Sequence, residues 1–196
     1  MKKIQSLFCR NYDGDRLVRD EVVPGSEWVL DDQGTPTVKL DGTCCLIRDG
    51  RLFKRYEVKK GKQPPPNFEP AGDIDANTGK QQGWVPVGDG PEDKYHREAF
   101  ERGEDAYGGL FEDGTYELVG PKIQGNPEKA TEHCLCGHGA ESIDEEDLTL
   151  SFDGIREFLS TRDIEGIVWH HPDGRMVKIK AKDFGLKRKA VAKSDV

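Results

Sequence analysis

One lysine in this sequence stands where it can act as a nucleophile. Lys39 lies two residues before the pair Asp41-Gly42, which typically turns the chain, and strand-forming residues flank it. Such an amine can attack a phosphorus centre once it has lost its proton, which ordinarily has a pKa of about 10.4. The same residues also fit a solvated lysine beside a hairpin turn, so residues further along the chain must decide between the two.

Two further lysines occur in a pattern suited to binding phosphate. Lys178 and Lys180 alternate with Ile179 in a strand-like stretch, so both side chains are expected on one face. Paired ammonium groups contact phosphate oxygens, neutralise developing negative charge and disfavour a third ammonium nearby. They would thereby help Lys39 to lose its proton. A half-exposed strand is the alternative for these residues alone.

Four short motifs resemble, in order and spacing, those of the covalent nucleotidyltransferases, which include polynucleotide ligases and mRNA capping enzymes. They are Lys39-Leu40-Asp41-Gly42 (motif I), Tyr116-Glu117-Leu118-Val119-Gly120 (motif III), Glu165-Gly166-Ile167-Val168 (motif IV) and Lys178-Ile179-Lys180 (motif V). Longer strings, including Asp183-Phe184-Gly185, resemble the RNA ligase branch typified by the vertebrate 5′–3′ RNA ligase and its small bacterial and phage-like relatives.

The resemblance implies an ATP-dependent RNA ligase. Such an enzyme joins an RNA 5′-phosphate to a 3′-hydroxyl through a covalent lysyl-AMP and an RNA-adenylate. Lys39 would be the nucleophile, Lys178 and Lys180 would be catalytic residues at the phosphates, and Val38 would lie beside the nucleotide with them. Two alternatives are a DNA or nick-sealing ligase core, and a non-catalytic module that binds nucleotide or RNA ends.

The remaining ligand contacts also follow from the resemblance. Glu117 would contact the ribose hydroxyls, and Glu165 would bind Mg²⁺ or Mn²⁺ directly or through water. Arg55 corresponds by position to an arginine of RNA ligases, and its guanidinium would hold the RNA 5′-phosphate. Three neighbouring cations compete for that role: Arg48, Arg51 and Lys54.

The chain departs from the family at the adenine. An aromatic residue usually stacks on the base between motifs III and IV, and none is convincing here. Phe152 and Phe158 are expected in the core, and Trp84 and Trp169 are expected to be packing residues. Leu135 or another apolar side chain is left as a contact for the base, and the stacking residue stays unassigned.

The composition indicates a globular protein with localised basic surfaces. The 196 residues carry a net charge of -8, and 34% are hydrophobic, which permits one substantial domain, 1–196. Basic residues concentrate in residues 48–62 and 175–193, where phosphates would bind. No apolar stretch reaches the ~20 residues that span a bilayer. A monomeric, cytoplasmic protein is expected.

Cysteine usage fits reduced thiols, since the five cysteines show no disulfide-framework spacing. His133, Cys134, Cys136 and His138 crowd together but lack the Cys-x-x-Cys spacing of a zinc site. Their alternation favours a half-buried strand with the two cysteines on one face.

The elements predicted from local pattern are mostly hairpin strands. Asp49-Gly50 joins strands 43–47 and 51–58, and Pro172-Asp173-Gly174 joins strands 165–169 and 175–180. Other strands are expected at 27–30, around Lys39, and at 84–87, 115–119 and 132–136. Helices are expected at 91–102 and 151–161. Residues 59–91 are expected to form a long loop.

The predicted fold is therefore α+β. It is an antiparallel-sheet nucleotidyltransferase core, ATP-grasp-like, with a few packed helices. Only sixteen residues follow Lys180, so no OB-fold is expected.

Overall fold

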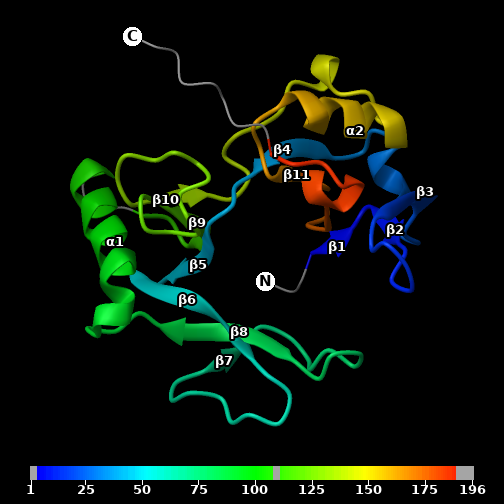
Figure 1. The fold of residues 1–196 in the computed structure, drawn as a ribbon. Coiled ribbons are helices and arrows are strands. Elements are labelled where there is room, and N and C mark those ends of the chain that lie inside the picture. The colour runs from blue at the N-terminus through cyan, green and yellow to red at the C-terminus, as the bar shows by residue number, and fades with distance from the viewer. Residues whose placement is uncertain (1–3, 108–110, 189–196) are drawn as a thin grey trace. The chain divides into compact units, whose positions relative to one another are not determined.

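The computed structural model describes residues 4–107 and 111–188, and these form two compact units (Figure 1). Unit 1 is Asp41–His138. Unit 2 combines Ile4–Leu40 with the chain from Gly139 onward. The prediction of a single domain stays a prediction, and the last part of the second basic run, 189–193, lies outside the described residues.

Unit 1 is built on a six-stranded antiparallel sheet in the order β10-β9-β5-β6-β8-β7. The strands are β5 (Thr43–Arg48), β6 (Arg51–Val58), β7 (Glu69–Pro70), β8 (Gln81–Pro86), β9 (Gly114–Val119) and β10 (Cys134–Gly137). Asp49 and Gly50 both have positive φ, as a two-residue hairpin turn requires, so the predicted β5–β6 hairpin is confirmed.

One helix packs on this sheet. A 3₁₀ turn, η2 (Pro91–Asp93), leads into α1 (Lys94–Tyr107), with a proline at the start as predicted. Ala99 of α1 joins a buried cluster with Cys45, Ile47 and Leu118 from the sheet. Residues on alternate positions of these strands therefore form the core, and the intervening positions face the other side.

Unit 2 contains a four-stranded sheet in the order β1-β12-β11-β4. Its strands are β1 (Gln5–Ser6), β4 (Thr35–Lys39), β11 (Gly166–His170) and β12 (Met176–Lys180). The predicted β11–β12 hairpin is confirmed, and β1 adds to β12 in parallel. A separate ladder joins β2 (Phe8–Arg10) to β3 (Val18–Val22).

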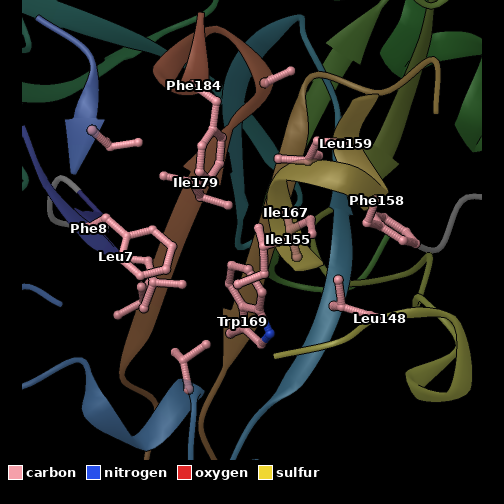
Figure 2. Close-up of a cluster of buried hydrophobic side chains, with 14 of the residues drawn as sticks. Leu7, Phe8, Leu148, Ile155, Phe158, Leu159, Ile167, Trp169, Ile179 and Phe184 are labelled. Carbon is pink, nitrogen blue, oxygen red and sulfur yellow. The ribbon is translucent and has the colours of Figure 1, made fainter. Parts of the chain in front are cut away.

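The helices of unit 2 are short. The longest, α2 (Phe152–Thr161), begins at Ser151, whose hydroxyl accepts a hydrogen bond from the Gly154 N–H. The 3₁₀ turns are η1 (Glu27–Val29), η3 (Glu145–Asp147) and η4 (Ala181–Phe184). Figure 2 shows Ile155 of α2 meeting Ile167 and Trp169 of β11 in the apolar core, where all three are fully buried.

The α+β prediction is confirmed, with two differences. The residues predicted as a strand at 27–30 form η1, because the adjacent side chains of Trp28 and Val29 are both buried, a pattern that a turn of helix satisfies and an alternating strand does not. The turn expected at Asp41-Gly42 also does not join paired strands, because β4 pairs with β11 and not with β5. Asp41-Gly42 is thus a link between units and not a hairpin.

The segment 59–91 is more ordered than the predicted long loop. It contains β7, and β8 begins at Gln81, three residues earlier than the predicted strand. In the described part of the chain, no helix has the length and apolar character needed to cross a membrane.

Close packing at the start of β11 gives the first prediction. A Cβ on Gly166 would lie 2.1 Å from the Ile179 carbonyl oxygen, whereas a Cβ on Gly114, the first residue of β9, meets no atom closer than 3.8 Å. Gly166→Ala is expected to lower the free energy of unfolding by about 1–3 kcal/mol, because the neighbouring backbone must shift. Gly114→Ala is expected to change it by less than about 1 kcal/mol. Urea unfolding of both variants measures this, and equal stabilities would contradict the close packing.

Candidate functional site

The three predicted catalytic lysines gather on one face of the unit 2 sheet. Gly166 of β11 pairs with Lys39 of β4 on one side and with Lys180 of β12 on the other. Val168 in the same way pairs with Thr37 and Lys178. Directly paired residues share a face of the sheet. Strand β11 therefore brings Lys39, which is far from the other two in sequence, to the same face as Lys178 and Lys180. Lys178 and Lys180 share a face, as their alternation predicted.

Glu165 joins two of these lysines. Its carboxylate forms ion pairs with the ammonium groups of Lys39 and Lys180, one through each oxygen. All three side chains are largely buried, and Lys39 Nζ also donates to the Leu40 carbonyl at 3.1 Å. Burial alone would raise the pKa of Glu165, but the charge of Lys39 and the hydrogen bonds from both lysines outweigh it, so the pKa lies below its ordinary value.

Lys178 brings a third positive charge to this face. Burial is the main reason that its pKa is lowered to about 8, and the charges of Lys180 and Lys39 lower it further. Among the described residues, Glu165 and Asp183 are the carboxylates whose charges act on Lys178, and Asp183 is paired with Arg10. An excess of positive charge on a half-buried face is suited to binding an anion such as phosphate.

The end of β12 is fixed by the residues that follow it. Asp183 accepts a hydrogen bond from the Lys180 backbone N–H at 3.1 Å and pairs with Arg10 at 2.5 Å. Phe184 is buried in the core, and Gly185 has a φ of 76°, which favours glycine. The Asp183-Phe184-Gly185 string therefore has a structural explanation: it ends the strand that carries Lys178 and Lys180.

Val38 faces away from the lysines. It pairs with Ile167 and packs against the apolar core of unit 2, while its backbone N–H donates to the Glu141 carbonyl. The side chain of this predicted nucleotide-binding residue lies on the face opposite Lys39. Any contact of Val38 with a nucleotide on the lysine face would be made by its backbone.

Glu117 is the central acidic residue of unit 1. It is buried in β9, and its Oε1 accepts a hydrogen bond from the Gly42 N–H at 3.0 Å. A Cβ on Gly42 would lie 2.2 Å from the Leu118 carbonyl oxygen, so glycine is required for this approach. The motif I glycine and the motif III glutamate are thus in direct contact.

Arg55 lies on β6, two strands from Glu117. The β5–β6 register sets it alongside Cys44, which pairs with Glu117, so the three share a face. Its guanidinium stacks 5.0 Å from the centre of the Trp84 ring, and its Nε donates to Gln82 at 3.1 Å. Burial lowers the pKa of Arg55, and the charge of Cys44 opposes this.

Two of the competing cations have other acidic partners. Arg48 pairs with Glu69 at 2.7 Å, and Lys54 pairs with the buried Asp93. Lys54 is next to Arg55 in the strand and therefore faces the α1 side of the sheet. Position on the sheet favours Arg55 over Lys54 for a role beside Glu117.

The residues considered for a zinc site do not gather in one place. His133 stacks on Tyr95 of α1 with ring centres 4.4 Å apart, and its Nδ1 lies 3.1 Å from Glu98. The sulfurs of Cys134 and Cys136 are 3.9 Å apart. Their mutual hydrogen bond is the main cause that lowers the pKa of Cys134 to about 7 and raises that of Cys136. The two cysteines share one face, as predicted.

Of the aromatic residues predicted to be core or packing residues, Phe158, Trp84 and Trp169 are buried, and Phe152 is partly buried against the unit 2 core. Phe158 and Trp169 belong to the unit 2 core, Phe152 packs 5.0 Å from Phe8, and Trp84 is buried in unit 1. Leu135 pairs with Leu118 and packs on the α1 side, opposite the face of Glu117. It is therefore not placed to meet a nucleotide bound at Glu117.

Sequence reasoning missed two neighbours of Glu117. His138 Nε2 lies 2.8 Å from Glu117 Oε2, and Cys44 is its cross-strand partner. No local motif marks either residue, because only strand register brings β5, β9 and the end of β10 together.

Comparisons with known proteins support the resemblance. A family model described as RNA ligase 1 matches residues 109–194. Proteins named RNA ligase 1 from Pongo abelii, Rattus norvegicus and Mus musculus are 40%, 39% and 37% identical to this chain over 83 residues. Each match covers 37% of this chain and 24% of the relative. The resemblance to RNA ligases is thus confirmed over a segment that includes Glu117, Glu165, Lys178 and Lys180.

The lysine cluster gives the second prediction. Below pH 8 Lys178 is protonated in both the folded and the unfolded chain. Burial of this charge therefore lowers the free energy of unfolding by its full desolvation cost. Lys178→Met is expected to raise the free energy of unfolding at pH 7 by ~1–2 kcal/mol, after allowance for partial exposure. The gain should shrink between pH 8 and about pH 10, where the folded wild type loses the proton first.

Lys180→Met is the matched control on the same strand. It removes a partner of the buried Glu165 carboxylate and is expected to lower stability by ~1–3 kcal/mol. Urea unfolding between pH 7 and pH 10 measures both variants. A loss of stability in Lys178→Met at pH 7 would contradict the electrostatic account.

Proposed function

We propose that this chain is an ATP-dependent RNA ligase that acts through a covalent lysyl-AMP. The observation that carries the proposal is the pairing of Lys39 and Lys180 with one buried carboxylate, Glu165, beside Lys178. The matches to RNA ligases over residues 109–194 support it independently.

The first step is the transfer of AMP to Lys39. Its neutral amine attacks the α-phosphorus of ATP, a nitrogen–phosphorus bond forms, and the bond to pyrophosphate breaks. Lys178 and Lys180 stabilise the charge that develops on the phosphate oxygens and the leaving group. In the ion pair with Glu165 the amine of Lys39 is held as an ammonium, so the pair must open and the proton must leave before attack.

The two later steps transfer the adenylate to RNA and then release it. An oxygen of the RNA 5′-phosphate attacks the lysyl-AMP, which frees the lysine. A 3′-hydroxyl then attacks the activated 5′-phosphate, and AMP leaves. We assign the ribose contact to Glu117 and the RNA 5′-phosphate to Arg55, and expect the protein to act as a monomer in the cytoplasm.

The carboxylate of Glu165, which lies beside Lys39, is suited to binding magnesium or manganese. Mg²⁺ commonly keeps several waters and needs few carboxylates, and Glu165 supplies one. Both of its oxygens already engage lysines, so we assign a contact through water. When bound, the metal would neutralise charge on the phosphates of ATP.

The third prediction concerns covalent adenylylation. Wild-type protein incubated with ATP and magnesium is expected to gain the mass of one AMP, as measured by intact-protein mass spectrometry. Lys39→Arg keeps a positive charge beside Glu165 but lacks the nucleophilic amine, so it is expected to show no adduct.

Treatment with pyrophosphate serves as the control for protein purified in the adenylylated form. It should reverse the reaction and return the chain to its unmodified mass. An AMP adduct on Lys39→Arg would overturn the assignment of the nucleophile. Absence of an adduct both in the wild type as purified and in pyrophosphate-treated wild type after fresh ATP and magnesium would overturn the ligase proposal.

The fourth prediction concerns the polymer. Sealing of a strand with RNA on both sides of the break is expected to exceed sealing of the all-DNA equivalent by at least about tenfold, because the 2′-hydroxyl allows a protein to distinguish RNA from DNA. Gel analysis with 5′-labelled strands measures both. Equal rates would favour the nick-sealing alternative.

A further inference from the structure

A second group of possible ligands lies in unit 1, around Glu117. One sulfur, one carboxylate oxygen and one imidazole nitrogen, from Cys44, Glu117 and His138, all lie within 4.8 Å of one another. In the described part of the chain, this is the group of three such side chains that is close enough to share an ion.

Strand register creates the cluster. Cys44 of β5 pairs directly with Glu117 of β9, so both side chains project from the same face. The backbone N–H of His138 donates to the Thr115 carbonyl at 3.0 Å, which continues the β9–β10 ladder by one residue. His138 is therefore placed diagonally across from Glu117.

The imidazole of His138 is already oriented as metal-binding histidines are. Its Nδ1 lies 2.9 Å from the Thr115 hydroxyl, and its Nε2 lies 2.8 Å from Glu117 Oε2. Metal-binding histidines typically use one nitrogen for the metal and bond the other to a neighbouring polar group, which fixes the ring and the tautomer. Here Thr115 would hold Nδ1, and Nε2 is directed toward Glu117.

We propose that Cys44, Glu117 and His138 form a site for a zinc-like divalent ion. Thiolate, imidazole and carboxylate are the ligands that Zn²⁺ uses in proteins, and three protein ligands leave the fourth position open. Tetrahedral zinc holds its ligand atoms roughly 3.5 Å apart. The required approach from at most 4.8 Å is small enough for side-chain torsions to make.

Proton release accompanies binding. The ion replaces the proton of the Cys44 thiol and any proton on His138 Nε2, and it binds Glu117 as a carboxylate. Affinity should therefore rise with pH through the range in which these groups lose their protons.

Cys136 is the neighbouring thiol that most resembles a competing ligand. It pairs with Glu117 from the other side, on β10. Its sulfur contacts Cys134, whereas the Cys44 sulfur belongs to the group that includes His138. Cys136→Ser is thus a matched control, since it removes a thiol from the same face.

The fifth prediction is a titration of the full chain, under reducing conditions, with Co²⁺ as the optical probe. One equivalent is expected to give a thiolate-to-cobalt charge-transfer band together with the visible bands of a tetrahedral ion, and one equivalent of Zn²⁺ should remove them. Cys44→Ser should abolish the charge-transfer band. Thr115→Val should weaken binding about 10–100-fold while keeping the band, because it removes only the support of His138.

The controls separate this site from other thiols. Cys136→Ser is expected to leave affinity and spectrum unchanged. Absence of the band in wild type, its loss in Cys136→Ser, or its persistence in Cys44→Ser would each overturn the proposal. Since Thr115→Val leaves all three ligands in place, unchanged affinity in that variant would overturn the orientation assigned to His138.

One consequence rests on the proposed function. Zinc bound to Glu117 withdraws the carboxylate from the ribose, so Zn²⁺ should inhibit adenylylation of the wild type in excess magnesium but not of Cys44→Ser. A cobalt spectrum without this inhibition would refute the shared use of Glu117 and leave the metal site intact. A missing spectrum would overturn the metal site whatever the ligation assay shows.

Discussion

The carboxylate of Glu165 is the constraint on which the lysine face of unit 2 depends. Removing the partner of a buried charge commonly costs about 3–5 kcal/mol, and the cost is smaller where a second partner remains, as Lys39 does for Glu165 without Lys180. Glu165 divides its two oxygens between Lys39 and Lys180, so strands β4 and β12 are both tied to the start of β11. The absence of a side chain at Gly166 allows β12 to approach closely enough for this arrangement.

The carboxylate of Glu165 does not balance three lysines, and the nearby Asp183 is paired with Arg10. The pKa of Lys178 is lowered, as expected for a buried ammonium group near other positive charges. A bound phosphate would supply the missing negative charge and favour the charged form of Lys178. The excess positive charge at this face therefore lowers the stability of the unliganded protein. A phosphate ligand that binds the folded state would raise it.

Local pattern predicted the elements of the fold better than their assembly. The β5–β6 and β11–β12 hairpins follow from Asp-Gly turns, and α2 follows from Ser151 and its apolar spacing. The pairing of β4 with β11 joins residues about 130 positions apart, and no turn signal encodes it. The partners of Glu117 were missed for the same reason, since Cys44 and His138 meet it only through strand register.

Two residues of motif I, Lys39 and Gly42, are each held by an acidic side chain. Lys39 is the last residue of β4 and is held by Glu165 in unit 2, whereas Gly42 lies in unit 1 and donates its N–H to Glu117. The unit boundary falls between them, at Leu40 and Asp41. A Cβ at Gly42 would collide with the Leu118 carbonyl oxygen, so the close contact of this residue with β9 requires glycine. Each residue is thus held within its own unit, Lys39 by the carboxylate of Glu165 and Gly42 by the carboxylate of Glu117.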